Sequence, residues 1–443
     1  MTSHILHRQI GTEMPVAVAG DGPYLIDNNG KRYLDASSGA AVSCLGHAHP
    51  RVTAAIKQQV EQLAFAHSAF FTNEPAEQLA TFLSERAPGD LKQVYFVSGG
   101  SEAIESALKL ARQYFVERGE AQRGRFIARR QSYHGNTLGA LSVGGNQWRR
   151  RDFAPLLTDC SHISPCYPYR DKSESESDEQ YGQRVANELE QEILRLGAAN
   201  VIGFIAETVG GATAGVLTPA PGYWPRIREI CDRYDILLIL DEVMCGMGRT
   251  GTLFACEQEQ IVPDIVAVAK GLGGGYQAIG AMLLSDKLFT QLATGSGALK
   301  GGHTYMAHAT ACAAALAVQR TIEEENLLDN VRQRGAELKQ ALDKQFAAHP
   351  HVGDIRGRGL FWGLEVVADR DSKQPFDSKL QLHERIRRNG LHHGLVCYPG
   401  GGTIDGSNGT HIMLAPPFII DHGHVQEIVD KLAATLDSSL GSI

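Results

Sequence analysis

Several patterns that mark other classes of protein are missing from this sequence. Its eight cysteines are scattered through 443 residues and form no Cys-x-x-Cys pair, so we predict no metal site and expect reduced thiols. The first 16 residues lack a basic segment followed by an apolar core, and we therefore expect no signal peptide. No apolar run is long enough to span a bilayer. These absences predict a cytoplasmic protein that does not enter a membrane.

Basic residues do not gather into a long run either. The chain has 42 basic and 50 acidic residues and a formal net charge of −8. Arg149, Arg150 and Arg151 form the densest basic patch, which we interpret as a solvent-exposed turn. Nucleic-acid binding needs a basic face that neutralises phosphates, so this composition argues against a nucleic-acid partner.

Short apolar runs alternate with amphipathic stretches between about residues 75 and 320. The runs are nearly continuous in apolar residues, which is typical of strands buried on both faces of a mostly parallel sheet. The alternation with helices such as 101–118 predicts an α/β domain. The expected strands cover 93–98, 125–129, 201–206, 236–240, 265–269 and 279–284.

Other segments predict the rest of the organisation. The polar stretch 169–183 is expected to be a surface loop, and 320–346 has the pattern of one long charged helix. We predict a large domain over 61–320 and a smaller α+β domain built from 1–60 and 321–443.

Three chemically distinctive groups follow strands of the expected sheet. Asp241 ends one strand, Lys270 follows another, and the Ser-Gly-Gly-Ser stretch at 98–101 begins a helix. Each has an ordinary interpretation alone: a cap, a surface amine or a helix start. In an open α/β sheet, however, ligands bind beyond the carboxyl ends of the strands. A helix N-terminus can bind a phosphate, a carboxylate can pair with a pyridine nitrogen, and an amine can form an imine with an aldehyde. These three groups together fit pyridoxal phosphate.

The span 237–276, which contains DEVMCGMGRTG and AKGLGGG, resembles the signature of class III (ω-type) pyridoxal-phosphate aminotransferases of fold type I. Asp241 and Lys270 are 29 residues apart, as that signature requires. The stretches VSGGSEAIESALKLAR, SYHGNTLGALS and HTYMAHATACAAALA resemble further family blocks, and the similarity covers about residues 15–430. The resemblance implies a large domain with a mostly parallel central sheet, a smaller α+β domain and bound pyridoxal 5′-phosphate.

The resemblance to class III aminotransferases also implies roles for individual residues. Lys270 would form the Schiff base with the cofactor, and Asp241 would keep the pyridine nitrogen protonated. Val243 would pack under the ring. Tyr133 would stack on the ring face, and His134 lies beside it in the same motif.

Four further residues are implied to bind the cofactor. Gly100 and Ser101 match the phosphate ligands, whereas Thr304 matches a residue that reaches the phosphate in the neighbouring subunit. Glu207 matches a family glutamate, but a structural role for it is equally open because a Thr and two glycines stand nearby in place of the usual motif. The cross-subunit contact implies a homodimer, or a tetramer of such dimers, with shared active sites.

Two stretches depart from the family pattern. Met413 stands where ornithine-type members carry an arginine that binds the substrate carboxylate, and 397–411 contains no arginine. Ala40 and Ala41 replace bulkier residues and suggest a roomier pocket. These features argue against an ornithine or acetylornithine enzyme.

The sequence therefore predicts transfer of an amino group from a primary amine or ω-amino acid to a 2-oxo acid such as pyruvate, by ping-pong kinetics through Lys270. An aminomutase, a racemase and a decarboxylating transaminase share the same motifs and stay open. A non-catalytic binding protein is disfavoured because Lys270 and Asp241 are intact. A nucleotide-binding Rossmann protein is disfavoured because no G-x-G-x-x-G motif opens the first βα unit.

Overall fold

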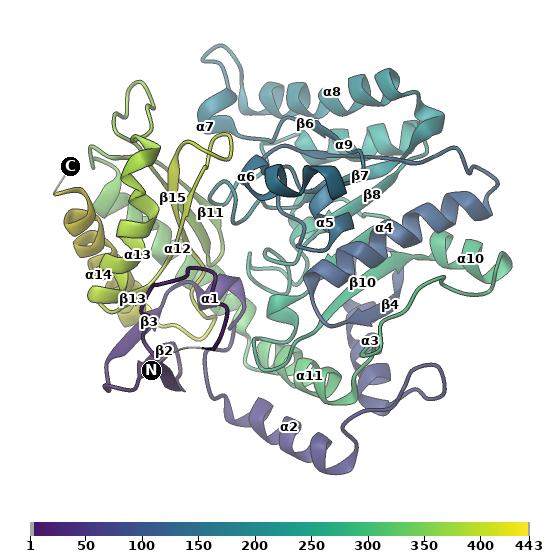
Figure 1. Cartoon of the computed structure of the whole chain (residues 1–443), viewed down its shortest axis with the longest axis horizontal. Coiled ribbons are helices and arrows are strands. Elements are labelled where there is room, and N and C mark those ends of the chain that lie inside the picture. Colours follow the sequence, from purple (N-terminus) through teal and green to yellow (C-terminus); the bar gives the residue numbers. More distant parts are fainter. Residues whose placement is uncertain (1–3, 442–443) are drawn as a thin grey trace.

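A computed structural model describes residues 4–441 (Figure 1). Its largest sheet has seven strands in the order β4-β10-β9-β8-β7-β5-β6. Strand β10 is antiparallel to both of its neighbours, and the other six strands share one direction. The mostly parallel α/β sheet is thus confirmed. The strands are β4 (Leu91–Val97), β5 (Arg125–Arg129), β6 (Ser161–Ile163), β7 (Val201–Glu207), β8 (Leu237–Asp241), β9 (Ile265–Val268) and β10 (Gly280–Ser285).

Helices cover both faces of this sheet, and alternate residues of a strand face opposite layers. Leu237 and Ile239 pack with the helices of one face, whereas Leu238 and Leu240 pack with those of the other. This explains why the strands are apolar at every position. The first face carries α4 (Gly100–Glu117), α5 (Leu138–Val143) and α10 (Asp286–Thr294); the second carries α3 (Glu74–Arg86), α8 (Asp178–Leu196), α9 (Tyr223–Arg233) and α11 (Ala309–Glu324).

The two ends of the chain share a second hydrophobic core. Leu34 and Val52 pack in one cluster with Leu364 and Leu432, and β3 pairs in parallel with β13. In Figure 1 the N-terminal strands lie beside the C-terminal helices. The domain boundaries near 60 and 320 stay predictions. The elements are β1 (Ala17–Asp21), β2 (Tyr24–Asp27), β3 (Arg32–Asp35), α1 (Ser38–Ala41), α2 (Pro50–Gln62), α12 (Leu327–Phe346), β11 (Val352–Arg358), β12 (Phe361–Val366), α13 (Leu382–His392), β13 (Leu395–Val396), β14 (Tyr398–Gly401), β15 (Thr410–Leu414) and α14 (His422–Leu440).

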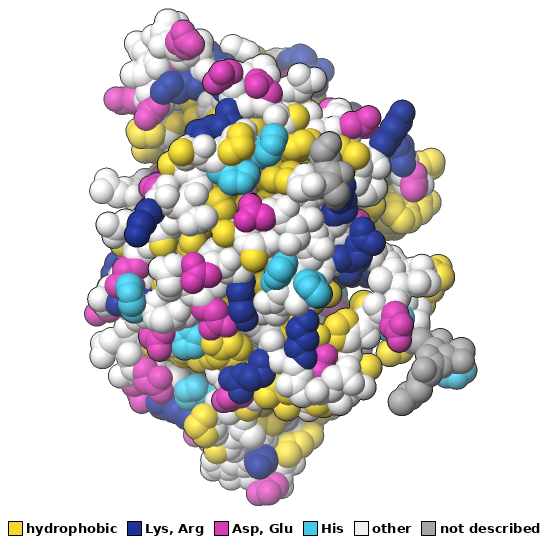
Figure 2. Space-filling model, turned by 90° about the vertical axis from the view of Figure 1, so that its left-hand side faces the viewer, with side chains coloured by type: hydrophobic (Ala, Val, Ile, Leu, Met, Phe, Trp, Pro, Cys, Tyr) yellow, Lys and Arg dark blue, Asp and Glu magenta, His cyan; other side chains and the backbone are white. Residues whose placement is uncertain are grey.

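Short elements complete the chain: the helices α6 (Gln147–Arg150) and α7 (Pro168–Asp171), and the 3-10 turns Arg151–Leu156, Ala198–Asn200, Ala255–Glu259, Lys270–Leu272 and Ser378–Leu380. All eight cysteines are free thiols. Within residues 4–441, no helix combines the length and the apolar character that crossing a membrane requires. On the face drawn in Figure 2, basic and acidic side chains are interspersed.

The predicted loop at 169–183 is wrong at both ends, because the short helix α7 extends to Asp171 and the second half of the stretch belongs to α8. Helix α8 already begins at Asp178, and Tyr181 in its first turns is fully buried. Ser177 and Gln180 form a reciprocal capping box that starts this helix. Composition alone suggested a loop because residues 178–180, which begin α8, are polar and exposed.

The single helix predicted over 320–346 is in fact two helices. Helix α11 ends at Glu324, Asn326 adopts a left-handed conformation with φ 52°, and α12 starts at Leu327. Asparagine tolerates this backbone better than most residues. The charged pattern continues across the break, so the periodicity alone does not reveal it.

Candidate active site

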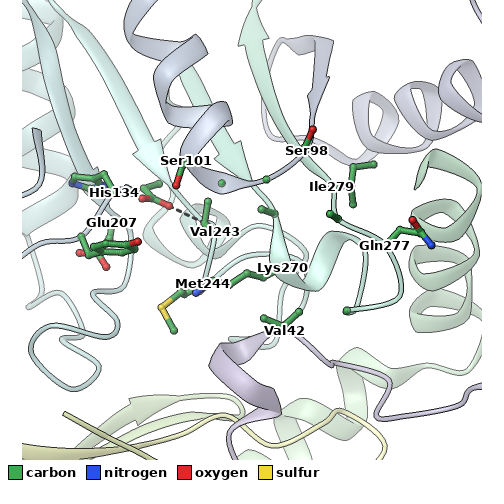
Figure 3. Close-up of a pocket in the computed structure, with 18 of the residues that line it drawn as sticks. Val42, Ser98, Ser101, His134, Glu207, Val243, Met244, Lys270, Gln277 and Ile279 are labelled. Atoms are coloured by element: carbon green, nitrogen blue, oxygen red, sulfur yellow. Dashed lines mark hydrogen bonds and ion pairs between the residues drawn. The ribbon is translucent and has the colours of Figure 1, made fainter. Parts of the chain in front are cut away.

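The carboxyl ends of β7, β8 and β9 open onto a cavity of about 400 Å³ (Figure 3). Eight of the nine predicted site residues line it, and Thr304 is the exception. The lining residues are Val42, Ser98, Gly99, Gly100, Ser101, Tyr133, His134, Gly135, Glu207, Val209, Asp241, Val243, Met244, Ala269, Lys270, Gly275, Gln277, Ala278 and Ile279.

Asp241 is buried at the end of β8 and is held by two hydrogen bonds. The Nδ1–H of His134 donates to Asp241 Oδ2 over 2.8 Å, and the backbone N–H of Val243 donates to Oδ1 over 2.9 Å. A carboxylate offers about four lone-pair sites, so Asp241 can accept a further hydrogen bond. His134 therefore orients the carboxylate, a function that its place beside Tyr133 in the sequence did not suggest.

Lys270 follows β9 and lines the cavity, and in Figure 3 its side chain extends toward Met244. Burial lowers the pKa of its amine to about 8, although the charges of Asp241 and Glu207 act in the opposite direction. Its backbone is left-handed, with φ 47°, which is a strained conformation for a residue with a side chain. The buried amide of Gln319 on α11 fixes the next turn by donating to the carbonyl oxygens of Gly271 and Leu272.

The N-terminus of α4 forms another wall of the cavity. Ser101 lies in its first turn, and the Ser101 Oγ accepts a hydrogen bond from the backbone N–H of Asn136 over 3.0 Å. Gly135 permits this approach, since a Cβ there would lie 2.7 Å from Ser101 Oγ. At Gly100, a Cβ would lie 2.9 Å from Val243. The glycines thus keep the free N–H groups of the helix close to the cavity.

Tyr133 lies in the loop after β5, and Glu207 ends β7. Tyr133 is half-buried, and the guanidinium of Arg149 lies 4.6 Å from its ring centroid. Glu207, at the end of β7, accepts the backbone N–H of Gly211 over 3.1 Å, and burial raises the pKa of its carboxyl. Ring stacking by Tyr133 and cofactor contact by Glu207 stay predictions.

Thr304 is exposed and lies outside the cavity of its own chain. Its neighbour Tyr305 borders a second cavity, which shares Ser98 and residues 277–279 with the first.

Sequence reasoning missed several lining residues. Val42 comes from the N-terminal segment, where Ala41 has a left-handed backbone, and Met244 follows Val243. Gln277 and Ile279 come from the segment after the glycines that follow Lys270. The only signal for this last pair was their closeness in sequence to Lys270.

The donor set of the cavity fits pyridoxal phosphate. Ser101 and the N–H groups at the start of α4 suit a phosphate, Asp241 keeps accepting capacity for a pyridinium N–H, and Lys270 provides an amine with a lowered pKa. Tyr133 and Val243 supply an aromatic and an apolar surface. Among residues 4–441, no group of three His, Cys, Asp or Glu side chains is arranged to hold a metal ion.

Comparison with known proteins agrees with this chemistry. The family model "Aminotransferase class-III" matches residues 8–436. An uncharacterized aminotransferase of Schizosaccharomyces pombe is 45% identical, over 97% of this chain and 94% of that protein. A putrescine–pyruvate aminotransferase of Pseudomonas aeruginosa is 32% identical, over 97% of this chain and 91% of that protein.

A solved structure, the ω-transaminase of Pseudomonas jessenii in complex with PMP, superposes with a TM-score of 0.92. It is 34% identical and covers all of this chain, which in turn covers 97% of it. The matches span both hydrophobic cores and every wall of the cavity. The chain therefore belongs to the class III aminotransferases, pyridoxal-phosphate-dependent enzymes of fold type I.

Proposed function

We propose that this aminotransferase moves an amino group from a primary amine or ω-amino acid to a 2-oxo acid such as pyruvate, by ping-pong kinetics. The donor is oxidised to a carbonyl compound, and the acceptor is reduced to an amino acid. The observation that carries the proposal is the cavity itself, in which Lys270 and Asp241 meet the start of α4 and no arginine is among the lining residues. The similarity to a putrescine–pyruvate aminotransferase supports an amine donor and pyruvate as the acceptor.

Each proposed role follows from the position of a side chain. Bound pyridoxal phosphate supplies an electron sink for the charge that develops at the substrate Cα. Lys270 Nζ would accept the proton from that Cα as a base and would then return it as an acid. Asp241 holds the proton on the pyridine nitrogen, and His134 holds Asp241 in place.

The remaining predicted site residues would hold the cofactor in the cavity. Ser101, Gly100 and the other N–H groups of the α4 N-terminus would bind the phosphate, and Tyr133 and Val243 would supply an aromatic and an apolar surface for the ring. Glu207 sits beside Asp241 in the register of the sheet and completes the polar wall.

The decisive experiment is a substrate panel. Purified enzyme is incubated with primary amines, diamines and ω-amino acids, each with pyruvate or 2-oxoglutarate, and both products are quantified. We expect turnover with an amine or ω-amino acid donor and formation of alanine from pyruvate. Turnover restricted to ornithine or acetylornithine would contradict the proposal.

An aminomutase, an amino-acid racemase or a decarboxylating transaminase is the alternative within the same family. Incubation with one amine or amino acid and no 2-oxo acid separates these activities. The proposed enzyme stops after one half-reaction per site, whereas a mutase or racemase continues to turn over. A decarboxylating transaminase releases CO₂ in proportion to turnover.

We also infer a homodimer, or a tetramer of such dimers, in which active sites are shared between subunits and Thr304 reaches the partner's phosphate. The exposure of Thr304 outside its own cavity supports this assignment. The net charge of −8 and the mixed surface in Figure 2 support small-molecule substrates rather than nucleic acid or membranes. Scattered free cysteines support a cytoplasmic location.

A further inference from the structure

A 2-oxo acid brings a carboxylate into a cavity that is poorly equipped to receive one. Lys270 is the one cationic side chain among the lining residues that the structure describes, and proton transfer occupies it in the proposed reaction. Asp241 and Glu207 add two carboxyl groups to the same walls. Binding an anionic acceptor therefore calls for a cation from just outside the cavity.

The basic patch formed by Arg149, Arg150 and Arg151 contains such a cation. Arg150 donates to three backbone carbonyl oxygens within 141–144, and Arg151 pairs with Asp152. The guanidinium of Arg149 differs from both, since it makes no hydrogen bond or ion pair with any of residues 4–441.

Arg149 instead rests on aromatic rings at the edge of the site. Its guanidinium lies 4.6 Å from the ring centroid of Tyr133, a cavity-lining residue, and 5.8 Å from that of Trp148. A guanidinium stays charged at every physiological pH, and its fork of N–H donors matches a carboxylate. The N–H donors of the Arg149 guanidinium thus have no partner among residues 4–441, and this group rests on a ring that lines the cavity.

The backbone of Arg149 is firmly anchored. Asn146 accepts its N–H through Oδ1 over 3.3 Å and donates to Gln131 Oε1 over 3.2 Å. Gln131 in turn donates to the carbonyl oxygen of Gly402 over 2.6 Å. Only the side chain of Arg149 has to move in order to change its partner.

The loop 402–409 closes over the start of the same helix. A Cβ at Gly406 would lie 3.1 Å from the backbone nitrogen of Trp148. This loop contains no arginine, and Met413 on β15 is fully buried in an apolar cluster. The cation that rests on the Tyr133 ring is therefore supplied by α6, not by the loop that covers this helix.

We propose that Arg149 is the carboxylate-binding residue for the acceptor 2-oxo acid, an assignment that rests on the proposed function. Its side chain rotates past the edge of the Tyr133 ring and exchanges a cation–π contact for a charge-assisted bidentate pair. The exchange is favourable because such pairs are stronger than an exposed cation–π contact. The arginine then returns to Tyr133 when the product amino acid leaves.

The test compares pyruvate, which carries a carboxylate, with butanal, which does not. Pyruvate and butanal are reacted with the aminated holoenzyme, and kcat/KM is measured for wild type, Arg149→Met, Arg149→Lys and the matched control Arg151→Met. We expect Arg149→Met to lose on the order of 10- to 100-fold with pyruvate and less than about threefold with butanal. Arg149→Lys recovers part of the loss, since it restores the charge without the fork. Arg151→Met behaves as wild type with both acceptors.

A binding measurement adds a readout independent of turnover. Calorimetric titration of the holoenzyme with propionate should give a weaker dissociation constant in Arg149→Met, whereas propionamide binding should be unchanged. Equal losses with pyruvate and butanal would overturn the inference, because they would mean that Arg149 only supports Tyr133. Unchanged kinetics with both acceptors would overturn it as well. A wild-type enzyme that aminates neither acceptor would instead refute the proposed function.

Discussion

The position of Lys270 and its burial together determine the reactivity of its amine. The strained backbone and the hydrogen bonds from Gln319 fix its turn, and burial brings the pKa of its amine to about 8. At pH 7 about a tenth of such amines are neutral, compared with less than one in a thousand for an ordinary lysine. The site therefore supplies a nucleophile at neutral pH without a separate base.

We predict that replacing Lys270 with Ala abolishes both covalent attachment of the cofactor and turnover. Borohydride reduction of wild type followed by peptide mapping should place the cofactor on Lys270. Lys287→Ala, which removes a surface lysine on α10, is the matched control and should keep the label. A label on any other lysine would refute the assignment.

The pH dependence of cofactor attachment follows from the same pKa. Because the folded-state pKa is depressed, the neutral amine forms as pH rises through about 8 rather than above 10. Stopped-flow absorbance during reconstitution of apoenzyme should show a rate that increases with pH and levels off above about 8. In Asp241→Asn the midpoint should fall further, because the charge of Asp241 raises the pKa of Lys270. A midpoint above 10 in wild type would contradict this account.

Asp241→Asn should also lose much more activity than cofactor. Removing one partner of a buried ion pair costs about 3–5 kcal/mol. If most of this appears in the transition state, kcat falls by about two to three orders of magnitude. Steady-state kinetics at saturating cofactor would measure the loss, with spectroscopic cofactor content as the control. Near-normal turnover would mean that Asp241 does not contact the ring nitrogen.

The sequence could predict most of this site but not all of it. Lys270 and Asp241 were predictable because strand ends of a parallel sheet meet at one edge. The hydrogen bond from His134 to Asp241 depends on the distance between the loop after β5 and the end of β8, which the sequence does not contain. Val42 reaches the cavity from the N-terminal segment, far from Lys270 in the sequence, so no local pattern marks it.

Among the elements, α8 shows where local signals conflict. The six sheet strands expected from the sequence all occur, with ends shifted by one or two residues, because long buried runs give a strong signal. Strand β6 has three residues, too few for such a signal. The start of α8 was hidden by its polar composition, although Ser177 and Gln180 carried the capping pattern.

We predict that Tyr181→Phe weakens the contact between α8 and the segment before α7. The Tyr181 hydroxyl accepts the backbone N–H of Tyr167 over 2.7 Å, and losing it leaves a buried donor without a partner. That costs about 1–3 kcal/mol, which corresponds to a fall of several degrees in Tm. Thermal unfolding of the holoenzyme measures this fall in Tm.

Tyr95→Phe is the matched control. Its half-buried hydroxyl on β4 makes no hydrogen bond to another of residues 4–441. An equal fall in Tm for both variants would show that the Tyr181 hydrogen bond contributes nothing specific.

At the scale of the whole molecule, the site joins parts of the chain that are distant in sequence. Arg249 is fully buried and donates to the carbonyl oxygens of Leu360 and Pro416, which links the segment after β8 to the C-terminal part. Burial lowers the pKa of this guanidinium to about 10, and it stays charged at neutral pH. Arg249 thus ties the segment after β8 to the second hydrophobic core, which contains Leu360.

The last prediction concerns assembly and rests on the place of Thr304. This residue is exposed in the turn before α11 and lies outside its own cavity, as expected if it completes the site of a partner. A Lys270→Ala chain is combined with a Thr304→Ala chain, and the heterodimer is isolated with two affinity tags. If Thr304 acts across the interface, one site carries both lesions and the other carries neither. The heterodimer then keeps about half of wild-type activity, although both parent homodimers are impaired. If Thr304 serves its own chain, one site lacks the lysine and the other lacks the threonine. Activity no higher than half that of the Thr304→Ala homodimer would therefore rule out the shared site.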